Sequence, residues 1–394
     1  MRSKEKLCSI ASTSIILFSY FLISASSVGL ASAVQSNHLT INETQITTNG
    51  SDYYYPNIYG DRIVWFGFWN SRWAIYMYNL STSRETPITI NGTMPEDLVI
   101  YGDKIVWADY FVNPNIYLYD LLTSKQTQIT TNGAAASPAI YEDKIVWMDS
   151  RKDGKRINME SPGNWNIYMY NISTSKETQL FPNESMKMFP AIYEDKIVWM
   201  DSRNGGSGNY WNLSGNWDIY MYNLSTRKKT QITTDETLQM RPAIYGNIIV
   251  WIDSCNGNGK IYAYNLTTSK ETAISNVSWK YDHPSIYGNR IVWMDFRNGS
   301  WEIYMFDLST SKETQVTTNS SNSQNPANPE IYGNRIVWNN WLNDANGTQL
   351  SDVYLYTVSG METGSNTEQQ SDKEKNKKVT GFELVHRFQN TSID

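Results

Sequence analysis

The amino-acid sequence predicts an all-β protein: a seven-bladed β-propeller of four-stranded antiparallel blades, closed by an N-terminal strand that completes the last blade. An Ile-Val-Trp motif recurs seven times at intervals of 40 to 52 residues, which is the spacing of propeller blades. Each copy consists of short runs of Ile, Val, Tyr, Trp and Thr between Gly-Asn and Ser-Thr-Ser turns, which favours strands over helices. The array also begins with an unattached strand and ends one strand short.

Residues 1–33 are predicted to be an export signal. Three basic residues precede an apolar stretch from about Leu7 to Ile23, and Ala31-Ser32-Ala33 supplies a small-residue cleavage site. The alternative is an uncleaved membrane anchor, but hydroxyl residues interrupt the stretch, which is shorter than the roughly 20 apolar residues of a membrane span. We therefore expect an extracellular protein, secreted or at the cell surface, with no membrane span in the mature chain.

Charge and cysteine content argue against a nucleic-acid partner and against an internal disulfide. The chain has a formal net charge of −6, and loss of the basic signal would make it more negative, so nucleic acid is not an expected partner. Cys8 would leave with the signal, and Cys255 alone cannot form an internal disulfide. Stability must therefore come from packing.

An unattached strand, Glu43 to Thr48, precedes the first repeat, and the predicted propeller covers residues 41–358. The strand of the seventh repeat from Val353 to Thr357 is followed by no fourth strand. Pairing these two segments would remove both open edges of the array. We therefore expect the N-terminal strand to close the ring.

Every repeat shows the same pattern of aromatic residues. The motif tryptophans are Trp65, Trp107, Trp147, Trp199, Trp251, Trp293 and Trp338, and the tyrosines six residues earlier are Tyr59, Tyr101, Tyr141, Tyr193, Tyr245, Tyr287 and Tyr332. In the sixth repeat we expect strands a to d at Ser285–Tyr287, Arg290–Met294, Glu302–Asp307 and Glu313–Thr317. Strands b and c are apolar on both faces, which indicates a sheet packed between two neighbours.

The repeat pattern P-x-IYGD-KIVW-x-D-x-R-x-G, followed by IYMYNLSTSKETQIT, resembles the propeller repeats of cell-surface proteins of methanogenic archaea and, more distantly, TolB-like propellers. The resemblance covers the seven copies. It implies an exported surface protein with a propeller fold. It implies little about activity, because propellers host many unrelated functions.

Residues 359–394 are predicted to form a disordered polar tail. Within it, VTGFELV resembles the start of the Pro-Gly-Phe sorting tails that anchor archaeal surface proteins. Thr380 stands where the proline is expected, and HRFQNTSID replaces the expected apolar segment and basic end. A degenerate sorting signal and a chance similarity both stay open.

Asn-x-Ser/Thr sequons recur at the hairpin between strands c and d, at Asn79, Asn171, Asn223 and Asn265. Exported chains can carry N-linked glycans at such exposed sites. The same residues also suit a tight turn, because asparagine accepts hydrogen bonds from its own backbone. We expect turn chemistry to explain the repetition and partial glycosylation to follow from it.

Catalytic residue types are sparse. His283 is the only histidine between residues 41 and 358, so no His-based metal centre or Ser-His-Asp triad can be assembled there. An aspartate follows the motif tryptophan by two residues in five repeats, at Asp109, Asp149, Asp201, Asp253 and Asp295. Catalytic carboxylates do not recur once per blade, so we interpret them as loop-fixing residues that pair with a nearby arginine. We expect no cofactor and no metal, because Arg151 takes a ligand position in DSRKDG.

The d-to-a and b-to-c loops should share one face of the ring, and this face carries most of the variation. The b-to-c loops of blades 3 and 4 are lengthened and rich in aromatic residues, which suit sugar faces and protein interfaces. Trp73, Trp165, Trp217 and Trp301 occupy equivalent positions just before strand c, and we interpret them as packing between blades rather than as ligand contacts. The expected ligand-binding residues are Tyr210, Trp211, Trp279, Tyr281, Trp69 and Trp341.

The sequence thus predicts a non-enzymatic binding or surface-layer module whose partner is a cell-wall polysaccharide or a surface protein. The alternative is a glycan-active hydrolase or lyase that uses acidic residues on the loop face. These two predictions differ in whether acidic side chains converge in one pocket.

Overall fold

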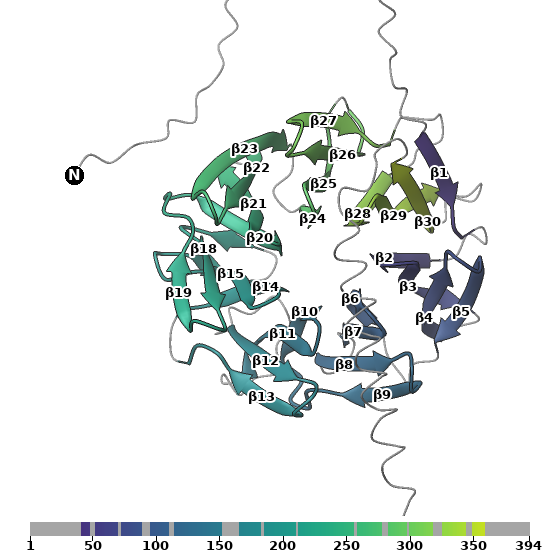
Figure 1. Ribbon diagram of the computed structural model, residues 1–394, viewed down its shortest axis with the longest axis horizontal. Helices are drawn as coiled ribbons and strands as arrows, with labels where there is room; N and C mark the ends of the chain where they lie inside the picture. Colours follow the sequence, from purple (N-terminus) through teal and green to yellow (C-terminus); the bar gives the residue numbers. More distant parts are fainter. Residues whose placement is uncertain are drawn as a thin grey trace, which may run out of the picture.

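The computed structural model describes residues 41–47, 52–69, 72–88, 95–109, 114–151, 165–182, 185–209, 212–255, 258–277, 283–297, 299–317, 325–343 and 349–358. Seven four-stranded antiparallel sheets stand around a central axis like the blades of a propeller (Figure 1), as predicted. None of the described residues belongs to a helix long and apolar enough to cross a bilayer. The predicted signal and the predicted tail lie outside the described residues and stay predictions.

Blades 1 to 4 follow one another along the chain. Blade 1 contains β2 (Asp52–Tyr59), β3 (Arg62–Trp69), β4 (Arg72–Asn79) and β5 (Arg84–Ile88). Blade 2 contains β6 (Pro95–Tyr101), β7 (Lys104–Asp109), β8 (Asn115–Asp120) and β9 (Lys125–Gln128). Blade 3 contains β10 (Ala135–Tyr141), β11 (Lys144–Asp149), β12 (Asn166–Asn171) and β13 (Lys176–Gln179). Blade 4 contains β14 (Lys187–Tyr193), β15 (Lys196–Asp201), β18 (Asp218–Asn223) and β19 (Lys228–Gln231).

Blades 5 to 7 complete the ring. Blade 5 contains β20 (Leu238–Tyr245), β21 (Ile248–Cys255), β22 (Asn258–Asn265) and β23 (Lys270–Val277). Blade 6 contains β24 (Ser285–Tyr287), β25 (Arg290–Asp295), β26 (Glu302–Asp307) and β27 (Lys312–Gln315), within two residues of the predicted strands. Blade 7 contains β28 (Asn325–Tyr332), β29 (Arg335–Asn343), β30 (Gln349–Val358) and β1 (Ile41–Gln45).

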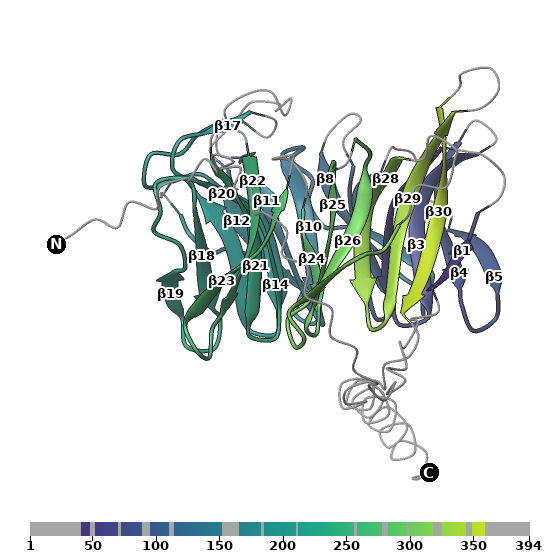
Figure 2. The same ribbon diagram turned by 90° about the horizontal axis from the view of Figure 1, so that it is seen from above.

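The strands of each blade alternate in direction, so the connections lie on the two flat faces of the disc. Figure 2 shows the disc from the side, with one face at the top and the other at the bottom. We call the side with the d-to-a and b-to-c connections the loop face and the side with the a-to-b and c-to-d turns the turn face. A small hairpin of β16 (Ser207–Gly208) and β17 (Leu213–Ser214) rises from the lengthened b-to-c loop of blade 4 on the loop face. The corresponding insertion of blade 3 lies outside the described residues.

The core lies between adjacent blades. In every blade the motif tryptophan of strand b stacks on a tyrosine of strand c, with ring centroids 5.6 to 6.2 Å apart. In blade 6, Ile291, Val292 and Trp293 are all fully buried although they point to alternate faces of the sheet. Burial on both faces is what the continuous apolar runs predicted.

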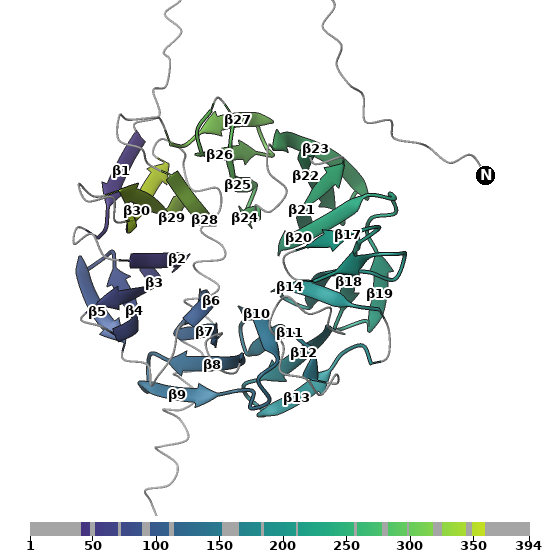
Figure 3. The same cartoon turned by 180° about the vertical axis from the view of Figure 1, so that it is seen from behind.

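The N-terminal strand closes the ring as predicted. β1 pairs antiparallel with β30, so that Glu43 lies opposite Tyr356 (Figures 1 and 3). The pairing continues past the strand, because the Ile46 amide donates to the Val353 carbonyl at 2.8 Å. The buried hydroxyl of Thr47 donates to Asp352 at 2.7 Å and accepts from the Val353 amide at 2.9 Å. The outermost strand of blade 7 is therefore fixed by side chains as well as by the ladder.

Three arginines join neighbouring blades on the turn face. Arg335 donates to the Gly60 carbonyl at 2.9 Å across the junction between blades 7 and 1, and Arg62 donates to the Gly102 carbonyl at 2.9 Å between blades 1 and 2. Arg290 makes the same contact with the Gly333 carbonyl at 3.3 Å between blades 6 and 7. The closing junction is thus held on the turn face by Arg335 and at the outer edge by β1.

Candidate functional site

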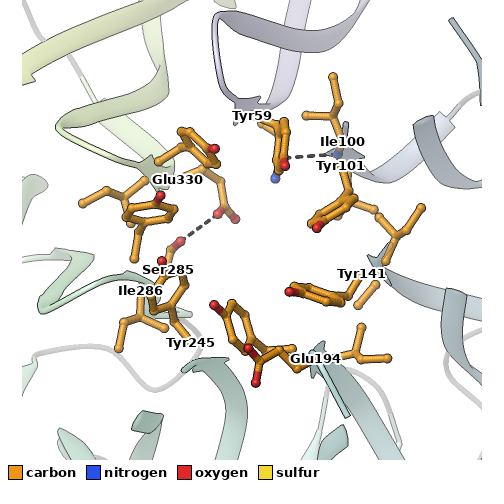
Figure 4. Close-up of a pocket in the computed structure, with 18 residues that line it drawn as sticks. Tyr59, Ile100, Tyr101, Tyr141, Glu194, Tyr245, Ser285, Ile286 and Glu330 are labelled. Carbon is orange, nitrogen blue, oxygen red and sulfur yellow. Dashed lines mark hydrogen bonds between the residues drawn. The ribbon is translucent and has the colours of Figure 1, made fainter. Parts of the chain in front are cut away.

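The seven tyrosines that end the innermost strands form a closed ring at the turn-face end of the central channel. Each ring lies next to the tyrosines of the two neighbouring blades, with centroids 4.6 to 5.0 Å apart and planes inclined by 45 to 52°. Tilted aromatic pairs at this separation are favourable. The side chains surround a cavity of about 330 Å³ on the propeller axis (Figure 4).

The a-to-b turn after each ring tyrosine requires a left-handed backbone. Glycine takes this position in five blades, as at Gly288, where φ is +60°. Blades 3 and 4 instead carry Glu142 and Glu194, with φ of +51° and +53°. Because side chains disfavour this conformation, both glutamates are strained. Glu194 also lines the channel cavity.

The channel wall is polar on one side. The residue two positions before the ring tyrosine points to the same side of its strand. It is Asn57, Ser285 or Glu330 in blades 1, 6 and 7, and Val99, Ala139, Ala191 or Ala243 in blades 2 to 5. The Ser285 hydroxyl donates to the Glu330 carboxylate at 2.7 Å, and His283 Nε2 lies 3.8 Å from that carboxylate. Glu330 thus joins blades 6 and 7 across the cavity wall (Figure 4).

The loop face is aromatic over the same blades. The position three residues after the motif tryptophan is Phe68 in blade 1, Phe296 in blade 6 and Trp341 in blade 7, whereas blades 3 to 5 carry Ser150, Ser202 and Ser254. Phe68 and Phe296 are 39% and 43% exposed, and the only other large apolar side chain that is exposed among the described residues is Leu122. Single exposed apolar side chains are common on protein surfaces, so these residues indicate an interaction site only if they belong to a contiguous patch.

These side chains pack with other aromatic residues. Trp341 contacts Tyr54 edge-on at 5.1 Å across the junction of blades 7 and 1. The ring centroid of Trp73 lies 6.0 Å from that of Tyr54 and 4.9 Å from that of Phe68. In blade 6 the ring centroids of Phe296 and Trp301 are 5.3 Å apart. We call this set the aromatic arc: Tyr54, Phe68, Trp73, Phe296, Trp301 and Trp341.

The four tryptophans predicted just before strand c divide into two kinds, and Trp73 lies inside that strand, β4. Trp165 and Trp217 are 2% and 0% exposed, whereas Trp73 and Trp301 are partly exposed. The indole of Trp217 donates to the Ser207 and Ser214 carbonyls at 3.2 and 3.1 Å, and a side chain at Gly206 would collide with it at 2.7 Å. Packing is therefore the role of this position in blades 3 and 4.

The recurring aspartates bind their own loops in blades 3, 4 and 6. Asp149 is buried, accepts from the Trp147 indole at 3.1 Å and from the Arg151 amide at 2.8 Å, and forms an ion pair with the guanidinium of Arg151. That guanidinium lies 4.2 Å above the ring of Tyr168. Arg203 and Arg297 make the corresponding ion pairs and ring contacts in blades 4 and 6.

Electrostatics agree with this loop-fixing role. Burial alone would raise the pKa of Asp201, but hydrogen bonds from Arg203 and Ser185 outweigh it and hold that pKa below its ordinary value. Within the described part of the chain, no group of three or more His, Cys, Asp or Glu is placed to hold a metal ion.

The structure describes two of the six predicted ligand-binding residues. Trp341 lies in the aromatic arc, and Trp69 is the last residue of β3. Tyr210, Trp211, Trp279 and Tyr281 fall outside the described residues, so their role stays a prediction. The sequence reasoning missed Phe68, Phe296 and Glu330, although all three were visible as departures from the repeat at fixed distances from a motif residue.

The sequon asparagines act as turn residues. The side-chain oxygens of Asn171 and Asn223 accept from Thr174 and Thr226 amides at 2.8 and 2.7 Å. Asn79 and Asn265 accept from the residue three positions on at 3.1 Å. These contacts support the turn-chemistry interpretation, and glycosylation of the same residues stays a prediction.

No protein-family model matches the chain, and no curated protein matches it. Solved structures match its fold. An oligogalacturonate lyase from Vibrio parahaemolyticus is 13% identical, with a TM-score of 0.60 and coverage of 82% of this chain and 95% of that one. The β-propeller domain of the Trilobed protease from Pyrococcus furiosus is 15% identical, with a TM-score of 0.57 and coverage of 80% and 99%. TolB from Acinetobacter baumannii is 16% identical, with a TM-score of 0.49 and coverage of 67% and 66%.

At these identities the similarity establishes the fold and leaves the function open. The propeller of the Trilobed protease has an open velcro topology, whereas β1 closes blade 7 here.

Proposed function

We propose that the protein is an exported, non-enzymatic binding module that holds a polysaccharide of the cell wall on the loop face of blades 6, 7 and 1. The observation that carries this proposal is the aromatic arc, which is exposed at Phe68 and Phe296 and continuous across the junction of blades 7 and 1. Flat rings with exposed faces stack against the apolar faces of sugar rings. Their placement on rigid strand ends keeps the binding surface ordered before the ligand arrives.

The alternative function, a glycan-active hydrolase or lyase, would need carboxylates that are available to a substrate. The recurring aspartates of blades 3, 4 and 6 are instead occupied by arginine side chains. Paired carboxylates on a glycosidase stand roughly 5 to 9.5 Å apart across a substrate. The two carboxylates that do share a cavity, those of Glu194 and Glu330, line the central channel and not the loop face where the alternative places its site. The loop-fixing contacts of the recurring aspartates therefore favour the binding function.

The test replaces the arc by the residues that blades 3 to 5 carry at the same position, in the triple variant Phe68→Ser, Phe296→Ser and Trp341→Ser. We expect its affinity for isolated cell-wall polysaccharide to fall at least about tenfold, because three aromatic contacts of about 0.5 kcal/mol or more each correspond to a factor of about ten. The binding of the chain without residues 1–33 is measured by sedimentation with the insoluble polysaccharide, and melting curves verify folding.

Leu122→Ser is the matched control, because Leu122 is 76% exposed in the c-to-d turn of blade 2, on the turn face. This control should bind like the parent chain. Unchanged binding by the triple variant would refute the proposal. Product release from the polysaccharide by the parent chain would support the enzyme instead.

A further inference from the structure

We propose that the central channel binds a primary alkylammonium group, held between the tyrosine ring and the carboxylate of Glu330. This site is separate from the aromatic arc, because it lies on the propeller axis near the turn face. The proposed ammonium site can therefore be tested independently of polysaccharide binding. The proposal rests on the charge, the hydrogen-bonding capacity and the size of the cavity.

The cavity selects for positive charge. Its lining includes two carboxylates, those of Glu194 and Glu330, and no lysine or arginine. Glu330 precedes the ring tyrosine Tyr332 by two residues, so it lies on the loop-face side of the ring, whereas Glu194 follows Tyr193 on the turn-face side. A cation inside the ring would therefore have a carboxylate on either side. In a partly enclosed site this attraction is stronger than in bulk water.

The nearby basic side chains do not neutralise the carboxylate of Glu330, because most of them are paired with other carboxylates. The three turn-face arginines, Arg62, Arg335 and Arg290, form ion pairs with Asp103, Asp61 and Asp307 at 2.7, 2.6 and 3.6 Å. Lys196 lies 3.4 Å from Glu194 and reduces the charge of that carboxylate. Glu330 has no such lysine or arginine among the ion pairs of the described residues, and the nitrogen that lies near it there is Nε2 of His283, at 3.8 Å. Glu330 is therefore the main anion of the site.

The hydrogen-bonding groups suit an ammonium with N–H donors. One oxygen of Glu330 accepts from Ser285 at 2.7 Å, and a carboxylate has lone pairs for about four such contacts. The labelled tyrosines Tyr59, Tyr101 and Tyr141 direct their hydroxyl groups toward the opening (Figure 4). Phenol oxygens accept hydrogen bonds, and a primary ammonium offers three donors. Hydrogen bonds to a charged group are about twice as strong as neutral ones.

The cavity volume of about 330 Å³ admits a side chain-sized group rather than a folded partner. The opposite wall, lined by Val99 and Ala139, suits the alkyl part of such a ligand. A lysine side chain and the amino terminus of a chain both present this chemistry. The common feature is a primary ammonium on an aliphatic stem.

The probe is n-butylammonium chloride, and its neutral counterpart of similar shape is 1-pentanol. Binding to the chain without residues 1–33 is measured by saturation-transfer NMR at constant ionic strength. We expect n-butylammonium to bind and 1-pentanol to bind at least about tenfold more weakly, as expected for loss of a hydrogen bond to a charged group. Equal binding of the two probes, or no binding of n-butylammonium, would overturn the proposal.

The variant Glu330→Gln locates the site. The glutamine oxygen can still accept from Ser285, so we expect an unchanged melting temperature and an affinity for n-butylammonium lower by about tenfold or more. Glu236→Gln, at an exposed position in the d-to-a loop of blade 4, is the matched control and should bind normally. Normal binding by Glu330→Gln would contradict the assignment. Peptides with one lysine and a blocked amino terminus, or with a free amino terminus and no lysine, then distinguish the two sources of the group.

Discussion

Blades 6, 7 and 1 have the same core pattern as blades 3, 4 and 5 but differ from them at three positions outside that pattern, one in the channel, one on the loop face and one after the a-to-b turn. Every blade has the same stacked Trp-Tyr pair between strands b and c. Blades 6, 7 and 1 carry Ser285, Glu330 and Asn57 in the channel, Phe296, Trp341 and Phe68 on the loop face, and Arg290, Arg335 and Arg62 after the a-to-b turn. Blades 3, 4 and 5 carry alanine, serine and Lys144, Lys196 or Ile248 at these positions.

The comparison separates the residues that specify the fold from those that are free to specialise. A residue buried between two blades is constrained from both sides, because close-packed interiors tolerate little change in volume. The positions in the channel and on the loop face vary between blades, whereas the core pair does not. The loop-face position is aromatic in blades 6, 7 and 1 and also in the sequence of blade 2, at Tyr110. Variation on a constant core is where we expect residues to specialise for function. The loop contacts of Asp149, Asp201 and Asp295 occur in both groups of blades and serve stability.

Removal of the N-terminal strand should have the largest effect on this arrangement. Deletion of residues 34–49 would expose the edge of β30 and leave the buried carboxylate of Asp352 without the partners Gln45 and Thr47. We expect aggregation and a fall in melting temperature on the order of 10 °C, because uncovered edge strands pair with other chains. Deletion of residues 34–40, which keeps β1, should leave the melting curve unchanged. An intact melting curve after the longer deletion would show that β1 does not hold the ring.

Replacing the equivalent tryptophans before strand c in blades 4 and 6 compares these two blades directly. Trp217→Ala in blade 4 should cost about 3 to 5 kcal/mol of unfolding free energy, as expected for a fully buried large side chain. Trp301→Ala in blade 6 should cost less than half of that, because Trp301 is partly exposed and contacts the exposed Phe296. Urea unfolding followed by far-UV circular dichroism measures both values. Equal losses would mean that the aromatic arc is core, and its role in binding would lose support.

The strained turns of blades 3 and 4 should have the smallest effect. Glu142→Gly introduces the residue that five other blades have at this position, where φ is +51°. We expect a gain of about 0.5 to 1 kcal/mol, because glycine adopts the left-handed conformation without steric cost. Glu236→Gly, at a position without a positive φ, serves as the control and should not stabilise the chain. A loss of stability in Glu142→Gly would show that the glutamate side chain contributes more than its backbone strain costs.

The sequence was sufficient for the fold because the signal was repeated. Seven copies of one pattern predicted the strands of blade 6 within two residues, and the missing fourth strand of blade 7 predicted its pairing with Glu43 to Thr48. Packing was the favoured interpretation of Trp217, but the contacts that bury it could not be predicted, because they depend on the β16–β17 hairpin and the close approach of Gly206. The contacts among the ring tyrosines were equally inaccessible, since each pair comes from two different blades and forms only when the ring is complete.

The pairing of β1 with β30 also sets an order on the making of the protein. Gln45 and Asp352 are 307 positions apart in the chain, and the strand that receives β1 is the last one of the propeller. During synthesis or export from the N-terminus, β1 must wait until nearly every other strand has emerged. Contacts this distant in sequence form slowly, and unpaired edges are exposed in the meantime. β1 is therefore the first strand of the propeller to be synthesised and among the last to pair.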